Sequence, residues 1–259
     1  MTVLVGTSGW QYDSWRGRLY PPEVPKARWL EHYAARFATV ESNNAFYRLP
    51  ERRTFADWAA RTPDDFVMAV KASRYLTHVR RLREPAEPVR RLVDRLEGLG
   101  RKCGPVLLQL PPTLRLDLDS LEATLAAFPR ALRLAVEPRH PSWFVDETRR
   151  LLERRRAALC LADRPGLRAP HWATADWGYV RFHEGRATPP PCYGQRALGT
   201  WAARIAGLWG RDADVYCYFN NDPGGCAPHD ARRFAGAAAR AGLDHARVPG
   251  RGEAPLDAC

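Results

Sequence analysis

Short apolar runs alternate with amphipathic helical patterns along almost the whole chain of 259 residues, and this alternation constrains the fold more than any other feature. A short apolar run between turn signals is typical of a buried strand, and helical spacing of apolar residues is typical of a helix packed on a sheet. Alternating strands and helices predict parallel β/α units. We therefore expect an α/β protein with a parallel sheet.

Eight strands and about seven helices are predicted. The strands lie at residues 3–5, 39–41, 66–70, 105–110, 132–136, 157–161, 179–182 and 214–219. The helices lie at residues 28–37, around 55–58, and at 89–99, 118–128, 145–155, 198–208 and 230–241. The segment 164–177 contains Pro165, Gly166 and Pro170, so the sixth helix is expected to be irregular or missing.

This count fits a (β/α)8 TIM barrel, whose usual length is about 250 residues. A doubly wound open sheet is the competitor, but no G-x-G-x-x-G motif follows the first strand. We expect a single TIM-barrel domain at residues 3–243 and a flexible C-terminal tail at 244–259, where Gly, Pro and Ala are frequent.

The chain is basic, with 40 Lys and Arg against 29 Asp and Glu and a formal net charge of +11. Such a charge suits a polyanionic partner such as nucleic acid. Only Lys26, Lys71 and Lys102 are lysines, and drift in a GC-rich genome would explain the choice of Arg over Lys but not the positive excess. A nucleic-acid surface and an ordinary solvated basic surface therefore both stay open.

No apolar run reaches the length of about 18 residues that a membrane span needs, and the N-terminus lacks a charged leader region. We expect a cytoplasmic protein without membrane contact.

The six cysteines contain no C-x-x-C pair, which argues against a zinc ribbon or a thioredoxin-like motif. Cys160 and Cys217 fall within apolar runs and are expected as buried thiols, and a chain of this length needs no disulfide to hold a core.

In a TIM barrel the functional residues lie at the carboxyl ends of the strands. Each predicted strand of this chain ends in polar or indole side chains. They are Trp10, Glu41, Asn43, Lys71, Gln109, Glu137, Arg139, His140, Asp163, Arg181, His183 and Asn220.

Glu41 and Glu137 end strands on different sides of the expected barrel mouth, so they could act as an acid/base pair across a substrate. His140, His183 and Asp163 complete the candidate catalytic set, with imidazole suited to proton transfer near neutral pH. The alternative is structural, because a buried carboxylate beside arginines is usually held in an ion pair.

The candidate substrate-binding residues fall into three chemical types. Lys71, Arg139 and Arg181 could hold a phosphate, sulfate or carboxylate. The amides of Asn43, Gln109 and Asn220 could bind sugar hydroxyls or base edges. The aromatic rings of Trp10, Tyr47 and Trp143 could stack on a sugar or a base, or could serve as packing.

A divalent metal is compatible with the carboxylates and imidazoles at the strand ends, but no spacing motif supports one and its ligands stay unknown. The residues considered as ligands are Glu41, Glu137, His140, Asp163, His183, Asp222 and His229.

Several motifs follow one another in order along the chain. They are G-T-S-G-W-Q-Y-D-S-W at 6–15, V-E-S-N-N-A-F-Y-R-L-P at 40–50, F-V-M-A-V-K-A at 66–72, L-Q-L-P-P at 108–112, V-E-P-R-H-P-S-W at 136–143, R-F-H at 181–183 and Y-F-N-N-D at 218–222. In this the chain resembles the YecE-like family, domain of unknown function 72. The resemblance implies a TIM barrel related in shape to endonuclease IV and xylose-isomerase-like enzymes, with no reaction established. Two departures from the family pattern are His183-Glu184-Gly185 and His229-Asp230.

Three functions follow as expectations. The first is an enzyme of hydrolase or lyase type whose basic, aromatic-lined mouth takes a small anionic substrate bearing a sugar or a phosphate. The second is a nucleic-acid-binding or DNA-processing protein that resembles endonuclease IV in shape. The third is a non-catalytic protein that binds a small ligand.

Overall fold

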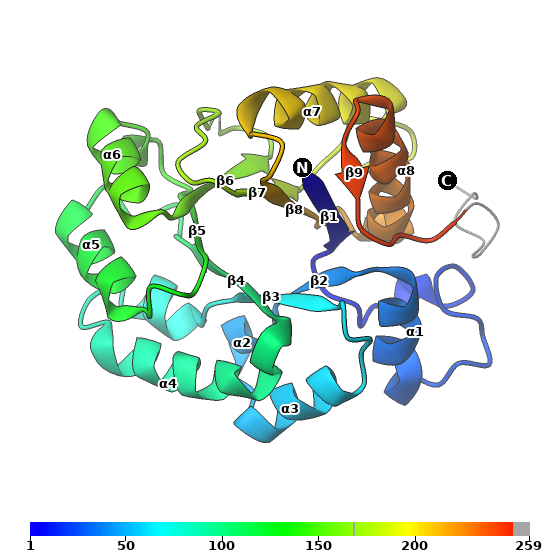
Figure 1. Ribbon diagram of the computed structural model, residues 1–259, viewed down its shortest axis with the longest axis horizontal. Coiled ribbons are helices and arrows are strands. Elements are labelled where there is room, and N and C mark those ends of the chain that lie inside the picture. Colours follow the sequence, from blue (N-terminus) through cyan, green and yellow to red (C-terminus); the bar gives the residue numbers. More distant parts are fainter. Residues whose placement is uncertain (168, 251–259) are drawn as a thin grey trace.

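In the computed structural model, which describes residues 1–167 and 169–250, a parallel sheet curls round and helices surround its outer side (Figure 1). Its strands within the described residues are β1 (Thr2–Thr7), β2 (Thr39–Ser42), β3 (Val67–Lys71), β4 (Cys103–Gln109), β5 (Leu134–Glu137), β6 (Ala158–Asp163), β7 (Gly178–Phe182), β8 (Asp214–Phe219) and β9 (Asp244–His245). Their order in the sheet is β2-β3-β4-β5-β6-β7-β8-β1-β9.

Strand β2, which stands at one end of the strand order, approaches β1, the next-to-last strand at the other end. There the backbone forms a parallel bridge between Ser8 and Glu41, and the Gly9 N–H donates to the Glu41 carbonyl at 2.8 Å. Gly6 permits this approach, because a Cβ at that position would lie 2.2 Å from the Thr39 carbonyl oxygen. The α/β class and the parallel sheet are confirmed. The fold is TIM-barrel-like, but the complete eight-strand closure is not confirmed, since a single bridge joins β1 to β2 over the described residues.

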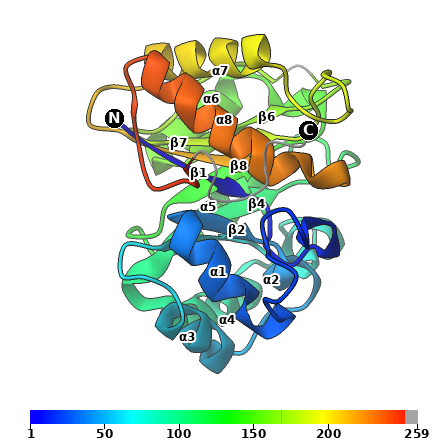
Figure 2. The ribbon, with the colours of Figure 1, turned by 90° about the vertical axis from the view of Figure 1, so that its right-hand side faces the viewer.

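The α-helices of the described residues are α1 (Trp29–Arg36), α2 (Asn44–Tyr47), α3 (Arg52–Ala60), α4 (Ala86–Leu96), α5 (Leu118–Ala127), α6 (Asp146–Arg155), α7 (Gln195–Leu208) and α8 (Cys226–Arg240). In the turned view, α1 to α4 lie along one part of the outside of the curled sheet, and α7 and α8 lie along the opposite part of it (Figure 2). No helix occurs among the described residues between β6 and β7, as the prolines there predicted.

Two apolar clusters form the core. The larger lies between the sheet and the helices, and helix α4, for example, buries Val89, Leu92 and Leu96 along one face. The smaller fills the inside of the curled sheet, where Ala69, Ala135 and Ala158 leave room for large rings. Those rings are Trp177, Tyr179, Tyr216 and Tyr218.

Part of the expected C-terminal tail is bound to the sheet. Strand β9 pairs with β1, and Arg247 forms an ion pair with Asp65 at 2.6 Å. Residues 244–250 therefore extend the domain, which corrects the expected boundary. The rest of that tail, 251–259, lies outside the described residues.

The cysteines differ from expectation at one pair. Cys160 and Cys217 are buried free thiols, as predicted, but Cys192 and Cys226 are joined by a disulfide that the sequence did not predict.

Within the part of the chain that the structure describes, no helix is both long and apolar enough to cross a bilayer.

Candidate functional site

Side chains alternate between the two faces of a strand, and this alternation places a set of polar side chains inside the curled sheet at the carboxyl ends of its strands. Residues two apart on a strand face the same side. Because Ala69, Leu107, Ala135 and Tyr179 belong to the inner cluster, Lys71, Gln109, Glu137 and Arg181 face inward one layer further along their strands. Neighbouring strands bring Gln109 and Glu137 into register.

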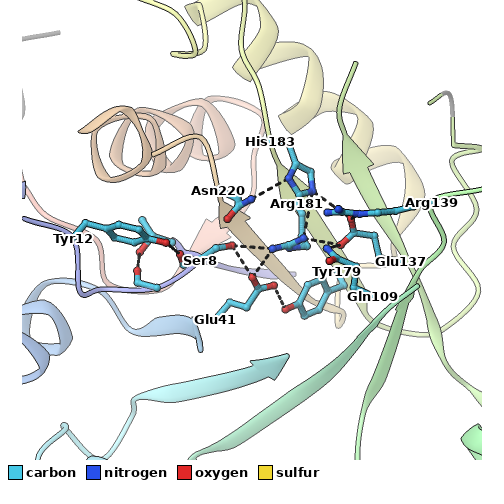
Figure 3. A network of polar contacts seen from close by, with 12 residues as sticks. Ser8, Tyr12, Glu41, Gln109, Glu137, Arg139, Tyr179, Arg181, His183 and Asn220 are labelled. Atoms are coloured by element: carbon cyan, nitrogen blue, oxygen red, sulfur yellow. Dashed lines mark hydrogen bonds and ion pairs between the residues drawn. The ribbon is translucent and has the colours of Figure 1, made fainter. Parts of the chain in front are cut away.

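Arg181 lies at the centre of this layer and binds two carboxylates (Figure 3). Its Nη2 lies 2.8 Å from Glu41 Oε1 and its Nη1 lies 2.7 Å from Glu137 Oε2. Both glutamates are fully buried and Arg181 is 1% exposed. Buried charges are stable only when paired and hydrogen-bonded. We refer to Glu41, Arg181 and Glu137 as the buried triad.

Further hydrogen bonds complete the surroundings of Glu41. The Ser8 hydroxyl donates to Oε1 at 2.6 Å, and the Tyr179 hydroxyl donates to Oε2 at 2.6 Å. Burial alone would raise the pKa of Glu41, but Arg181 and these two donors outweigh burial and hold the pKa below its usual value. Glu41 is therefore an anion at neutral pH.

Glu137 is surrounded by donors in the same way. Gln109 donates from Nε2 at 2.9 Å, and Arg139 donates from Nε at 3.0 Å. Burial would raise the pKa of Glu137, but Arg181 and His183 outweigh it and hold the pKa well below its usual range. Both carboxylates are thus saturated with donors, which fits the structural alternative better than proton transfer. Their catalytic role stays a prediction.

His183 uses both ring nitrogens within the protein. Asn220 Nδ2 lies 3.1 Å from Nδ1, and Glu137 Oε1 lies 3.4 Å from Nε2. If Asn220 donates to Nδ1, the ring proton is on Nε2 and faces Glu137. Burial lowers the pKa of His183, so the ring is neutral at physiological pH. This arrangement suits His183 to positioning Asn220 and Glu137.

Lys71 is the inward-facing cation without an anion of its own. It is 8% exposed, has no ion-pair partner among the described residues, and places Nζ 3.9 Å from the centre of the Phe46 ring. Burial, and after it the charge of Arg181, lower the pKa of Lys71 to about 8. An anion arriving beside Lys71 would restore the pKa and would itself be stabilised.

Above the buried triad lies a cavity of about 610 Å³, which we call the mouth cavity. Its lining residues are Tyr12, Asn43, Phe46, Tyr47, Lys71, Arg74, His78, Gln109, Arg139, Arg181 and Asn220. Seven of the predicted site residues are among them. Lys71, Arg74, Arg139 and Arg181 are cations, whereas no Asp or Glu lines the cavity within the described chain.

Tyr47 marks the edge of the mouth cavity. Its side chain is 81% exposed, an unusual state for an aromatic ring. Together with Asn43 it also lines a second hollow of about 650 Å³, the side hollow, which lies over α2, α3 and the segment between them. A ligand longer than the mouth cavity therefore has a second depression to enter beyond Tyr47.

Four predicted site residues lie away from the mouth cavity. Trp10 packs edge-on against Trp58 in the core, and Trp143 is fully buried with Nε1 donating to the Leu114 carbonyl. Both rings serve as packing, which corrects the expected stacking role.

The other two are polar. His140 Nδ1 accepts from the Ser142 N–H and so caps the turn Pro141–Trp143. Asp163 accepts from Trp201 Nε1 at 2.9 Å and lines a separate hollow beside α7. Both groups are occupied in holding local structure, so their catalytic role rests on the sequence argument alone.

The metal candidates at the mouth do not converge. Within residues 1–167 and 169–250, the one group of three His, Cys, Asp or Glu side chains close enough to hold an ion is Cys192, His229 and Asp230. Of the candidates from the sequence, it contains only His229.

Sequence reasoning missed Arg74 and Tyr179. Arg74 follows Lys71 by three residues in the loop after β3, so its place at the strand end was a usable signal. Tyr179 precedes Arg181 by two residues on β7, and strand parity places both on the inner face.

The chain is similar to known proteins over almost its whole length. A family model described as "Protein of unknown function DUF72" matches residues 4–252. The UPF0759 protein YunF of Bacillus subtilis (strain 168) is 24% identical over 270 residues, with 90% of this chain and 93% of that protein covered. The crystal structure of a DUF72 family protein from Thermotoga maritima MSB8 has 29% identity and a TM-score of 0.81, covering 91% of this chain and 98% of the other.

The crystal structure of SacUVDE is a more distant neighbour. It shares 9% identity at a TM-score of 0.56, with 93% of this chain and 98% of that chain covered. At such identity the likeness concerns the fold alone.

Proposed function

The chain belongs to the DUF72 family, a family of unknown function, and on that premise we propose that its mouth cavity binds a phosphate-bearing nucleic-acid strand. The observation that carries the proposal is the charge of the mouth cavity, which is lined by four cations and by no carboxylate among the described residues.

The positive charge at the mouth cavity exceeds the negative charge of the two glutamates in the buried triad. The two glutamates of the triad offset two of the four positive charges and face Arg181 and Arg139. Lys71 and Arg74 have no ion-pair partner among the described residues. Two uncompensated cations beside guanidinium groups attract an anion, and phosphate is well matched because guanidinium donors bind its oxygens in pairs.

The size and the rings of the site favour a nucleotide unit of a strand. A volume of about 610 Å³ falls within the range of small-molecule pockets and is too small for a duplex. An unpaired or flipped nucleotide would fit, with its base stacked on exposed Tyr47 and the next unit in the side hollow. The net charge of +11 supports the same class of partner.

In this proposal the buried triad has a positioning role. Glu41 and Glu137 fix the two ends of the Arg181 guanidinium, and Glu137 also orients Arg139, so the binding donors are held before the ligand arrives. Lys71, whose pKa of about 8 leaves part of its amine neutral near physiological pH, is the group best suited to chemistry on a bound ligand.

A small phosphorylated ligand is the second candidate, favoured by the enclosed position of Lys71 and Arg181 at the floor of the cavity. It differs from the first in needing neither Tyr47 nor the side hollow.

Fluorescence anisotropy with labelled single-stranded DNA, an intact duplex and an abasic-site duplex tests the proposal across a salt series. We expect the single strand and the abasic duplex to bind more tightly than the intact duplex, with affinity falling as salt rises because bound phosphates release counterions. Equal affinity for all three, or no binding at low salt, would overturn it. Competition by inorganic phosphate or a sugar phosphate without binding of any strand would support the small-ligand candidate instead.

A further inference from the structure

A second cluster of reactive side chains lies apart from the mouth cavity, where the loop after β7 meets the start of α8. Cys192 comes from the loop, and Cys226, His229 and Asp230 come from the first turns of α8. All four are buried. The ligand atoms of Cys192, His229 and Asp230 lie within 4.8 Å of one another, and Cys192 is bonded to Cys226 with a Cα–Cα distance of 5.1 Å.

Two buried atoms of this cluster lack hydrogen-bond partners. Neither His229 Nδ1 nor Asp230 Oδ1 makes a hydrogen bond among the described residues, and the two atoms lie 3.4 Å apart. The side chain of His229 is 8% exposed and that of Asp230 is fully buried. A buried polar atom without a hydrogen bond is destabilising, so these two neighbouring atoms point to a ligand between them.

We propose that this cluster, with its cysteines reduced, binds one Zn²⁺ through Cys192 Sγ, Cys226 Sγ, His229 Nδ1 and Asp230 Oδ1. Two thiolates and an imidazole are ligands that Zn²⁺ prefers, and four ligands complete its tetrahedral shell. Cys226 and His229 are three residues apart on α8, so both face the same side of the helix. A thiolate pair on Zn²⁺ needs sulfur atoms about 3.8 Å apart, from Zn–S bonds of about 2.3 Å, so the disulfide and the bound metal are alternative states.

A thiol reductant can convert the disulfide state into the metal-binding state. Two thiols of the reductant become its disulfide and pass two electrons and two protons to the Cys192–Cys226 bond. Zn²⁺ then displaces the two thiol protons into solvent, because only thiolates ligate. The resulting site carries one net negative charge from two thiolates and one carboxylate against the ion. Arg233, whose Nη1 lies 3.6 Å from Asp230 Oδ1, offsets that charge.

Neighbouring residues orient the Asp230 carboxylate, and a surface hollow borders His229. Asp230 Oδ2 accepts from the Tyr193 N–H at 2.7 Å and from Asn221 Nδ2 at 2.8 Å, which turns Oδ1 toward His229. His229 also lines a surface hollow of about 650 Å³, so the imidazole side of the cluster borders the surface.

Titration of the full-length protein with Co²⁺ tests the proposal, since Co²⁺ reports tetrahedral thiolate ligation by its visible and charge-transfer absorption. Protein reduced with a phosphine is expected to bind one equivalent, displaced by Zn²⁺, whereas protein oxidised with diamide is expected to bind none. Absence of a tetrahedral thiolate spectrum from reduced protein that circular dichroism shows to be folded would overturn the proposal. Reduced protein that stays unfolded with and without Zn²⁺ would overturn it as well.

Matched variants assign the ligands. C192S and C226S are expected to abolish the thiolate spectrum, and H229Q to weaken Co²⁺ binding at least tenfold while leaving the fold intact. C103S, which removes a free thiol elsewhere, is expected to bind like the wild type. Binding that H229Q leaves unchanged would contradict the assigned site. These readouts do not depend on nucleic-acid binding.

Discussion

Arg181 and Glu137 form a completely buried ion pair, with Nη1 2.7 Å from Oε2, at the point where β7 and β5 deliver their last inward-facing side chains. The other side of the same guanidinium binds Glu41 from β2. One residue thus connects strands that are distant in the sheet order, and the properties of the mouth cavity depend on it.

Removal of Arg181 is expected to destabilise the protein strongly. R181M leaves two buried carboxylates without their shared cation, and breaking a buried pair in this way costs about 3–5 kcal/mol. Urea denaturation followed by circular dichroism measures the free energy of unfolding. R149M is the matched control, because the side chains of the Arg149–Glu153 pair are 48% and 42% exposed and the pair should contribute less than about 1 kcal/mol. A comparable loss in both variants would contradict a special role for the buried triad.

The buried triad predicts acid sensitivity. The pKa values of Glu41 and Glu137 are lowered by folding, so their contribution to stability is complete above the unfolded value of about 4.3 and is lost as pH falls through the folded values. We expect the unfolding free energy to decline below about pH 5. In E137Q that decline should be shallower, and in E23Q, an exposed control, unchanged. Parallel curves for E137Q and the wild type would count against the assignment.

Strand binding is expected to weaken as pH rises through about 8, because the pKa of Lys71 is lowered to about 8 and the neutral amine no longer attracts phosphate. Phosphodiesters keep their charge across this range, so the pH dependence belongs to the protein. Anisotropy titrations at pH 6.5 to 9.5 measure it. K71R stays charged and should lose this dependence; an unchanged profile in K71R would place the titrating group elsewhere.

Arg74 and Tyr47 are expected to affect binding differently. R74A should reduce the salt slope by about 0.7, the value of one phosphate contact on a single strand. Y47A should weaken binding by about 1–3 kcal/mol, the contribution of one stacked base, at an unchanged salt slope. R211A, in the loop before β8 at the opposite end of the strands, is the control and should bind normally. If Y47A binds strands normally, the base does not stack there.

The approach of β1 to β2 requires glycine at position 6. In G6A the new Cβ would overlap the Thr39 carbonyl, and such overpacking costs at least about 1–3 kcal/mol. G199A in α7 is the matched control: nothing lies within 4 Å of its Cβ, and alanine should stabilise that helix by about 0.5–1 kcal/mol. Thermal unfolding of both variants measures the contrast, and a neutral G6A would mean that the two strands can separate at little cost.

Much of the local structure was predictable from the sequence. The eight predicted strands are present within about two residues of their expected bounds, and the missing sixth helix follows from Pro165 and Pro170. The start of α8 was less accurate: the helix begins at Cys226, four residues before the predicted start, and β9 was not predicted. Such short pairings depend on a partner strand that local periodicity does not contain.

The sequence alone determined the β/α order and the strand ends at which Glu41, Lys71, Glu137 and Arg181 lie, because periodic burial is a local property of the chain. Only the tertiary structure decided which of the strand-end residues meet. Curling of the sheet turned Arg181 toward both glutamates, and packing of the loops placed Trp10 and Trp143 in the core. These outcomes depend on contacts between residues far apart in the sequence, from the 29 positions that separate Leu114 from Trp143 to the 140 that separate Glu41 from Arg181, and the short windows that predict a helix or a strand do not contain such contacts.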